Sequence, residues 1–589
     1  MKVFILVLSF FAYDAIAQIE DAKWVFGIAN KYMAPDPDTS FNGIEFNFIE
    51  SPIKISRQDK QTMIFYSTCS SIVGLDSTVL FYTNGCSISD GNHRSIEDTI
   101  NFGPQWINWG GEGLPTIQAA LTLPFPDHDN EYYLLYTEYN LAGQHDKLKY
   151  SFLKKLVDKV TVINKDVLIG QDLLSGQITA CKHANGRDWW IVCPEWQDSV
   201  FNFYLLDDKG IKFVNKQILP NGFRRYIGQI NFSPDASKLV LNSGGYFWAN
   251  GTRVSIYDFD RCSGIISNPR YDFMNGETFS TGVSFSDDSR YVYTSDNYQI
   301  NQYDLLSADI IHSKKIVANY DGFFYVSPID VNIPPYEWKT LPGYMILAPD
   351  GKIYITSGSG GTRHMGVIEY PNEEGELSDV RQHSIFLPAW AARTAPNFPN
   401  YRLGPLDGSN CDTLGLDNNP IAKYRYEGDT LDHLKVRFTD LSYFRPETWH
   451  WDFGDGTSFD GKKPYWHTFP KNGVYHVCLT VSNENSSNTL CRNVVIGTTS
   501  IADEDLPILN DRVSVFPNPT DGEVLLTLSD YIPEHGVLKV YDLLGKMVMS
   551  TRVYYGWNNI DMTMLPSGNY IYEAVDKDVR IGEGKIVKM

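Results

Sequence analysis

The chain has 589 residues, which is too long for one hydrophobic core, so we expect several domains. Hydrophobic residues make up 43% of the chain and charged residues 21%, as in a globular protein, and its 36 Tyr, 32 Phe and 13 Trp residues favour β-strands. The formal net charge of −21 argues against a nucleic-acid-binding groove, because phosphate binding needs clustered Lys and Arg. We therefore predict a modular all-β protein that does not bind nucleic acid.

The first residues have the pattern of a secretory signal peptide. Lys2 precedes an apolar run from Val3 to Tyr13, and the small residues on either side of Ile16 predict cleavage after Ala17. This run is shorter than the roughly 20 residues that a membrane-spanning helix needs. We expect residues 1–17 to be removed and the mature chain to be secreted without a transmembrane segment.

Secretion makes the eight cysteines candidates for disulfides. Three pairs flank turn-like segments between extended runs, which predicts the disulfides Cys69–Cys86, Cys181–Cys193 and Cys478–Cys491. Elimination then joins Cys262 to Cys411. Free buried thiols are the alternative.

Residues 18–405 repeat a strand–turn–strand plan. The clearest copies are "INFSPDASKLVL" from Ile230, "VSFSDDSRYVY" from Val283 and "MILAPDGKIYI" from Met345. In each copy an apolar strand ends in Ser or Ala, a Pro/Asp/Gly turn follows, and a basic residue precedes the next strand. Further strands lie some 20 residues downstream, so a unit of about 50 to 60 residues holds about four strands, the size of one propeller blade.

This pattern resembles the WD-like β-propeller repeats, although the Trp-Asp signature is missing. The resemblance implies a propeller of about seven blades over residues 18–405. A stacked array of β-sandwiches is the alternative. Residues 406–422 are rich in Pro, Gly, Asn and Asp and are predicted to be a linker.

Residues 423–498 return to alternating strands. They carry "WDFGDG" from Trp451, "HTF" from His467, "GVY" from Gly473 and "LTVSN" from Leu479. These motifs, in this order, resemble the polycystic-kidney-disease-type (PKD) domain. The resemblance implies a small immunoglobulin-like β-sandwich.

The acidic "WDFGDG" motif raises the question of a metal site. In such a sandwich Trp451 and Phe453 would point inward, and the two glycines, Gly454 and Gly456, would adopt positive φ in a tight turn. Asp452 and Asp455 would then accept hydrogen bonds from the turn's own backbone. Calcium bound by these two aspartates is the alternative, and we expect no other metal or cofactor.

The last segment, residues 511–589, follows an acidic linker at 499–510. It carries "VFPNPTDG" from Val515, "LKVYDLLGKMV" from Leu538 and "LPSGNYIYEA" from Leu565, and it ends in "GKIVKM". These motifs resemble the C-terminal sorting domain of type IX secretion substrates in Gram-negative bacteria. The resemblance implies a small β-sandwich that the outer-membrane export machinery reads, and a cell-surface or extracellular location.

Catalytic motifs are missing from the sequence: it has no nucleophile elbow, His-Glu-x-x-His pair or phosphate-binding loop. Tryptophans at a propeller mouth would stack on sugar rings or partner side chains, which makes Trp106, Trp109 and Trp390 candidate ligand-binding residues. We expect no catalytic residues, and we predict a secreted protein that binds extracellular glycan or protein through its propeller.

Two alternatives to this function remain. A propeller glycoside hydrolase or lyase could follow the same export route. The sequence does not exclude it, because a catalytic pair of carboxylates in the propeller funnel has no characteristic spacing in a sequence. A structural component of the envelope is the other.

Overall fold

The computed structural model describes most of the chain from residue 18 onward. The described residues are 18–28, 42–49, 53–101, 112–140, 145–174, 176–196, 199–221, 227–244, 252–274, 282–326, 337–358, 361–394, 396–429, 432–464, 466–496, 513–516, 520, 522–528, 536–542, 546–553, 556–576 and 579–588. They contain 43 strands and one short 3-10 helix, η1 (Gly375–Ser378). The predicted all-β class is confirmed. The predicted signal peptide and its cleavage site lie outside the described residues.

The chain divides into two compact units, residues 1–497 and 498–589. The first unit holds the propeller and the PKD-type domain, and the individual domain boundaries stay predictions. No helix in the described part of the chain is long and apolar enough to span a membrane.

The propeller region begins with a three-stranded sheet and three four-stranded sheets, all antiparallel. The first sheet contains β1 (Lys23–Gly27), β2 (Gly43–Asn47) and β3 (Lys54–Gln58). The next sheets contain β4 (Ser70–Val73), β5 (Val79–Thr83), β6 (Ile88–Asp90) and β7 (Ser95–Glu97); β8 (Ala120–Pro124), β9 (Glu131–Tyr139), β10 (His145–Lys155) and β11 (Val160–Leu174); and β12 (Thr179–Lys182), β13 (Trp189–Pro194), β14 (Val200–Asp207) and β15 (Gly210–Ile218).

Three more four-stranded sheets complete the region. They contain β16 (Ile227–Phe232), β17 (Lys238–Gly244), β18 (Thr252–Asp260) and β19 (Ile265–Met274); β20 (Val283–Phe285), β21 (Tyr291–Ser295), β22 (Gln299–Asp304) and β23 (Lys315–Asn319); and β26 (Pro342–Leu347), β27 (Ile353–Ser357), β28 (Thr362–Ile368) and β29 (Val380–Ala391). A two-stranded sheet of β24 (Phe324–Val326) and β25 (Glu337–Lys339) lies between the last two in sequence.

Burial decreases from the inner to the outer strands of a sheet. In β12–β15, every residue of β13 is buried, whereas β15 alternates between exposed and half-buried residues. The inner strands are therefore nearly continuous apolar runs such as "WWIVCP", and the outermost strand carries Lys212 and Lys216. This gradient is expected of blades that pack face to face around an axis.

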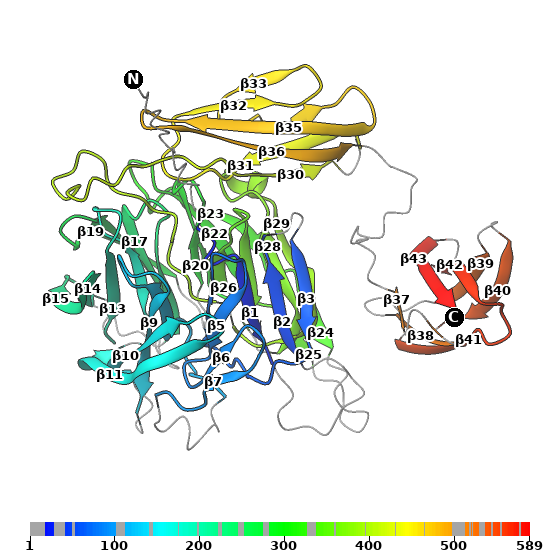
Figure 1. The fold of residues 1–589 in the computed structure, drawn as a ribbon, viewed down its shortest axis with the longest axis horizontal. Coiled ribbons are helices and arrows are strands. Elements are labelled where there is room, and N and C mark those ends of the chain that lie inside the picture. Colours follow the sequence, from blue (N-terminus) through cyan, green and yellow to red (C-terminus); the bar gives the residue numbers. More distant parts are fainter. Residues whose placement is uncertain are drawn as a thin grey trace, which may run out of the picture. The chain divides into compact units, whose positions relative to one another are not determined.

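The ring closes where the first sheet meets the last. The Trp24 ring on β1 lies 5.6 Å from that of Tyr354 on β27, and the Ile28 amide donates to the Trp390 carbonyl at 3.0 Å. Figure 1 shows the sheets following one another in chain order, with β28 and β29 beside the first sheet. The propeller is confirmed, and the count of about seven blades stays a prediction.

Amide side chains fill the axis of the propeller. Gln118, just before β8, donates to the Ile230 carbonyl and accepts from the Ile230 amide, both at 2.9 Å, although Ile230 lies on β16, two sheets away. Gln229 on β16 does the same with Met345 on β26, at 2.7 and 3.1 Å. Gln229 also accepts from the Val283 amide on β20 at 2.9 Å, so these two side chains link inner strands of several sheets around the axis.

The segment that leaves the last blade crosses this axis too. The Asn397 side-chain amide donates to the carbonyls of Ala120 (3.0 Å) and Ile178 (2.9 Å), and the Asn397 backbone amide donates to Cys69 (3.0 Å). One residue thus ties three sheets together. The predicted linker 406–422 continues along the propeller, where the Leu406 amide donates to Ala184 at 2.8 Å.

Two of the four predicted disulfides are present. Cys262 is bonded to Cys411, which fixes the linker to the loop after β18, and Cys478 is bonded to Cys491. The latter two residues lie directly opposite each other on adjacent strands, with Cα atoms 4.0 Å apart.

The predictions Cys69–Cys86 and Cys181–Cys193 are wrong, since all four residues are free and buried. Cys181 pairs in register with Trp190, three residues from Cys193, and this odd offset places the two sulfurs on opposite faces of the sheet, in different core clusters. Cys69 and Cys86 also belong to different clusters.

The PKD-type domain is a two-sheet sandwich, as predicted. One sheet contains β30 (Tyr424–Gly428), β31 (Lys435–Asp440) and β34 (Trp466–Thr468); the other contains β32 (Thr448–Asp452), β33 (Ser458–Asp460), β35 (Gly473–Ser482) and β36 (Ser487–Ile496). Trp451 and Phe453 point into the core while Asp452 is exposed. Figure 1 shows this domain covering one end of the propeller.

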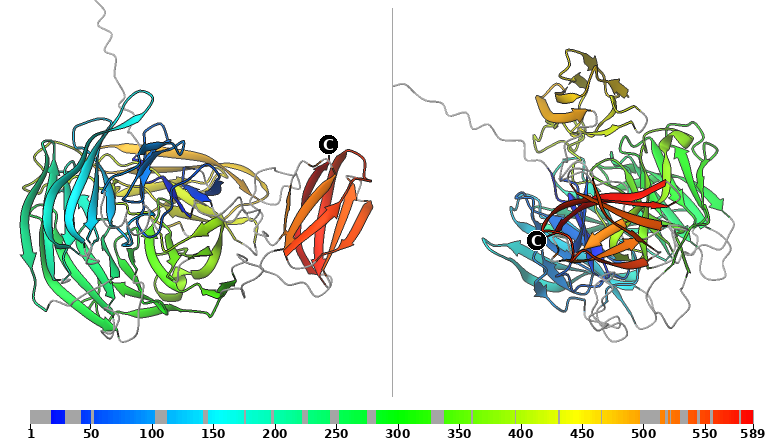
Figure 2. Two further views of the ribbon diagram at one scale, coloured as in Figure 1. Left: turned by 90° about the horizontal axis from the view of Figure 1, so that it is seen from below. Right: turned by 90° about the vertical axis from the view of Figure 1, so that its right-hand side faces the viewer.

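The C-terminal unit is a second sandwich. Its sheets contain β37 (Val513–Phe516), β38 (Glu523–Leu528) and β41 (Gly556–Asp561), and β39 (Gly536–Asp542), β40 (Met547–Arg552), β42 (Gly568–Asp576) and β43 (Val579–Lys588). Apolar side chains from both sheets, such as Leu526 and Val540, form one core. Figure 2 shows these strands in the orange and red part of the chain.

The cysteine assignment makes a direct prediction. Mature protein that is denatured without reductant should expose four reactive thiols, those of Cys69, Cys86, Cys181 and Cys193. The native protein should react slowly, because burial raises the pKa of each thiol and excludes reagent. Thiol titration followed by peptide mapping measures both. Fewer than four thiols in the denatured protein would contradict the assignment.

The two turn glycines of the PKD-type domain make a matched pair. Both have positive φ, 71° at Gly454 and 91° at Gly456, but a Cβ would lie 2.6 Å from the His476 carbonyl oxygen only at Gly454. We expect Gly456→Ala to cost about 1 kcal/mol of unfolding free energy and Gly454→Ala about 3 kcal/mol, because only Gly454 adds a backbone clash. Denaturant unfolding measures both, and equal costs would be the contrary result.

Candidate functional site

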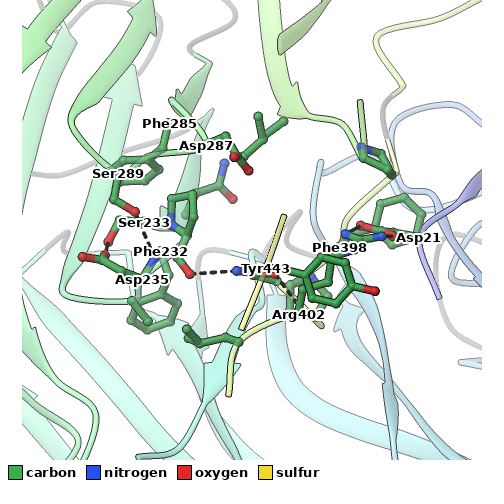
Figure 3. A pocket seen from close by; sticks show the side chains of 18 of the residues that line it. Asp21, Phe232, Ser233, Asp235, Phe285, Asp287, Ser289, Phe398, Arg402 and Tyr443 are labelled. Carbon is green, nitrogen blue, oxygen red and sulfur yellow. Dashed lines mark hydrogen bonds and ion pairs between the residues drawn. The ribbon is translucent and has the colours of Figure 1, made fainter. Parts of the chain in front are cut away.

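A cavity of about 400 Å³ lies at the end of the propeller that the PKD-type domain covers. The turns of all three sequence repeats line it: β16–β17, β20–β21 and β26–β27. The segment 396–403 and residues 441–446 of the PKD-type domain complete the wall. Figure 3 shows Phe232 and Phe285 on one side and Phe398 on the other.

The axis amides form the floor of the cavity. Gln118, Gln229, Asn231 and Asn397 all line it, and their side chains are engaged with backbone groups of the inner strands. The described part of the propeller centre therefore presents amides at the floor of the cavity, while Asp235, Asp287 and Asp288 line the cavity at the repeat turns.

The PKD-type domain is fastened to the last blade by basic side chains. Arg425 donates to the carbonyls of Asp350 and Glu369, both at 2.6 Å, and Lys423 donates to the Pro349 carbonyl at 3.0 Å. Burial lowers the pKa of Lys423 to about 8. Because these donors use propeller backbone as their acceptors, the domain holds a fixed position and serves as one wall of the cavity.

An ion pair fixes the segment 396–403 on the opposite wall. Arg402 binds both carboxylate oxygens of Asp21, at 2.8 Å for one of them, near the start of the first blade (Figure 3). Asp21 also raises the pKa of Arg402, against the effect of burial. This wall is thus charge-paired, and neither residue is free to bind an ionic ligand.

Carboxylates occupy the side where the propeller meets the PKD-type domain. Burial raises the pKa of Asp287, against the attraction of Lys462. Burial also raises the pKa of Asp440 to about 6, although Ser442 and Lys462 act in the opposite direction. The Trp449 indole donates to Asp440 at 2.9 Å. Asp287 lines the cavity, and Asp440 lies behind it in a neighbouring crevice.

Of the three tryptophans predicted to bind ligand, the structure describes only Trp390, which does not line this cavity. Trp106 and Trp109 lie outside the described residues. Trp390, on β29, is 4% exposed, and its ring packs edge-on against Tyr325 on β24. The cavity's tryptophan is Trp449, which belongs to the PKD-type domain.

The two calcium candidates belong to the turn of the PKD-type domain. Asp452 accepts from the Gly454 amide at 2.9 Å. Asp455 accepts from the Thr457 amide at 2.9 Å, from its hydroxyl at 2.6 Å, and contacts the His467 ring at 2.8 Å. These are the predicted turn-stabilising contacts. A calcium role stays a prediction.

Sequence reasoning missed Asp287, Asn397, Trp449 and Lys462. The available signal was the repeat itself: its three turns meet at one cavity, and Asp287 stands where the other two copies have Pro. No local pattern marks Asn397, because its hydrogen-bond partners lie hundreds of residues away in the sequence. None marks Lys462 either, because its neighbours in space lie tens of residues away or more.

Comparison with protein families identifies the two C-terminal modules. Residues 420–496 match the model described as "PKD domain", and residues 514–588 match "Secretion system C-terminal sorting domain". The chain is therefore a β-propeller protein with a PKD domain and a type IX sorting domain. The sorting domain indicates secretion to the cell surface or extracellular space of a Bacteroidetes-type Gram-negative bacterium, and it implies contact with the export machinery.

Two solved structures illustrate a distant likeness. The chain is 9% identical to an α-L-arabinofuranosidase of Fusarium graminearum, with 63% of this chain and 97% of that chain covered and a TM-score of 0.30. It is 10% identical to the β-propeller domain of the Trilobed protease of Pyrococcus furiosus, with 69% and 89% covered and a TM-score of 0.22. Such distant likeness says nothing about a shared activity. Comparison with curated proteins finds no match.

Asp440 makes the stability of the first unit depend on pH. Its pKa is raised in the folded protein, so the folded state binds the proton more tightly than the unfolded state, and the stabilisation is lost as pH rises from about 4 through 6. Asp440→Asn cannot titrate. The unfolding free energy of this variant relative to wild type should therefore rise by up to about 3 kcal/mol between pH 4 and pH 7. Denaturant unfolding across this pH range measures the difference in unfolding free energy between the variant and wild type. A difference that does not change with pH would contradict the prediction.

Proposed function

We propose that this protein is a secreted glycan-binding protein without catalytic function, and that the cavity between the propeller and the PKD domain is its ligand site. The observation that carries the proposal is the cavity itself. Its volume of about 400 Å³ lies in the range of small-ligand sites, and its wall mixes aromatic rings with polar side chains. A concave site of this size suits a short saccharide better than the face of a folded protein.

The lining has the chemistry that sugars require. Phe232 and Trp449, both partly exposed, supply aromatic surface for the apolar side of a pyranose ring, and the Asp287 carboxylate supplies an acceptor for a hydroxyl group. Export to the cell surface or beyond would place this site among extracellular glycans. Binding there would make the protein a surface receptor or adhesin.

A cavity-filling variant tests the proposal. Pro234 lines the cavity at the second position of a β-turn, where most residues are tolerated, so Pro234→Trp should fill the site without unfolding the blade. Pro470→Trp, in an exposed part of the PKD domain outside the cavity, is the matched control. We expect wild type and control to bind the same array glycans and Pro234→Trp to lose at least about tenfold in affinity.

Three results would contradict the proposal. Unchanged binding by the folded Pro234→Trp variant would place the ligand elsewhere. Hydrolysis of an array glycan by the wild type would move the protein to the alternative class of propeller glycoside hydrolases. Binding to no glycan at all would favour a structural role in the envelope.

A further inference from the structure

The three repeat turns at the cavity share one backbone conformation. Each closes with a hydrogen bond from its fourth residue to its first: Ala236 to Ser233 at 2.7 Å, Ser289 to Ser286 at 3.0 Å and Gly351 to Ala348 at 2.8 Å. The fourth residue has positive φ in every copy, at 53°, 61° and 75°. The turns can therefore be compared position by position.

The third position of each turn is an aspartate that stabilises the turn. Asp235 accepts from Ser237 at 2.9 Å, Asp288 from Arg290 at 3.2 Å, and Asp350 from Lys352 at 3.1 Å, each from the backbone amide two residues on. These carboxylates have the same structural role in all three blades, so their presence at the cavity needs no ligand to explain it.

The second position separates one turn from the other two. It is Pro234 and Pro349 in two copies but Asp287 in the third, and proline is favoured there because its fixed φ suits the turn. Among the described residues, the Asp287 carboxylate accepts no hydrogen bond and forms no ion pair. Asp287 thus adds a carboxylate to the cavity that the turn does not use.

A cation of the PKD domain lines the same cavity as this carboxylate. Lys462 lines the same cavity and attracts Asp287 electrostatically, yet no ion pair joins them in the described structure. The Lys462 ammonium lies 5.6 Å from the centre of the Trp449 ring. The acceptor comes from the propeller and the donor from the PKD domain. Partly exposed aromatic rings lie on both sides: Phe232 on the side of Asp287 (Figure 3) and Trp449 beside Lys462.

We infer that Asp287 and Lys462 are the two polar contacts of one uncharged sugar unit, which bridges them inside the cavity. One hydroxyl donates to the Asp287 carboxylate, a second oxygen accepts from the Lys462 ammonium, and the apolar face of the ring packs on the aromatic wall. We expect an uncharged sugar because a charged one would be attracted by one of the two side chains and repelled by the other, while burial of its own charge adds a desolvation cost that an uncharged sugar lacks. This assignment rests on the proposed function and makes the PKD domain half of the binding site.

The test uses the full mature chain and saccharides of known charge as probes. Glucose, galactose, mannose and their disaccharides are compared with glucosamine and glucuronic acid by titration calorimetry and saturation-transfer NMR. We expect an uncharged sugar to bind best. Asp287→Pro, which restores the residue of the sister turns and should fold, and Lys462→Met should each weaken its binding at least tenfold. Lys463→Met is the matched control, because Lys463 is adjacent but lies 3.8 Å from Glu373 and outside the cavity.

The possible outcomes separate this inference from the proposed function. Tightest binding of glucosamine or glucuronic acid would overturn the inference and leave glycan binding in place. So would full affinity of Asp287→Pro or Lys462→Met for the preferred sugar. An equal loss of affinity in Lys463→Met and Lys462→Met would also overturn the inference, because removing any nearby positive charge would then have the same effect. Failure of the wild type to bind any of these sugars would overturn the proposed function together with the inference.

Discussion

The Asn397 side chain at the propeller axis is the constraint on which the first unit depends. Its side-chain and backbone amides donate to Ala120 on β8 and to Ile178 and Cys69, which directly precede β12 and β4. Its side-chain carbonyl oxygen lies 3.2 Å from the Gln118 amide, which in turn binds β16. A propeller blade buries its faces only against its neighbours, so the ring needs a closure. Here apolar packing between the first and last sheets closes the rim, and buried amides close the centre. Each buried amide that lost its partner would cost about 1 to 3 kcal/mol.

The same closure shapes the candidate site. Because amides block the centre, the space at the covered end is a cavity with a floor. Because the segment after Asn397 continues through Arg402 to the Cys262–Cys411 disulfide, its course fixes one wall and leads into the PKD domain. Lys423 and Arg425 then bind the turn of the last blade and position the opposite wall. The propeller and the PKD domain therefore line one cavity together. Under the proposed function they would share the ligand site, whereas the sequence predicts recognition by the propeller alone.

Local patterns in the sequence predict the modules well and the site poorly. The strand–turn–strand repeat, the "WDFGDG" turn and the C-terminal motifs are short-range signals, and each corresponds to a formed element. The Cys478–Cys491 prediction is correct because two residues at equal distances from a tight turn lie opposite each other on the paired strands. The Cys181–Cys193 prediction fails on register: three residues of offset reverse the side of the sheet. Asp287 and Lys462 line one cavity only because the chain folds back over the propeller, which no spacing in the sequence encodes.

Native-state hydrogen exchange with Asn397→Ala tests the central claim most directly. If the Asn397 amide closes the axis, the backbone amides of β4, β8 and β12 should exchange about 30- to 1,000-fold faster in the variant, corresponding to a loss of about 2 to 4 kcal/mol. The amides of β35 and β36 in the PKD domain should keep their protection, because their ladder does not involve the axis. Unchanged protection of the three inner strands would contradict the claim and would show that packing between blades closes the ring without the axis amides.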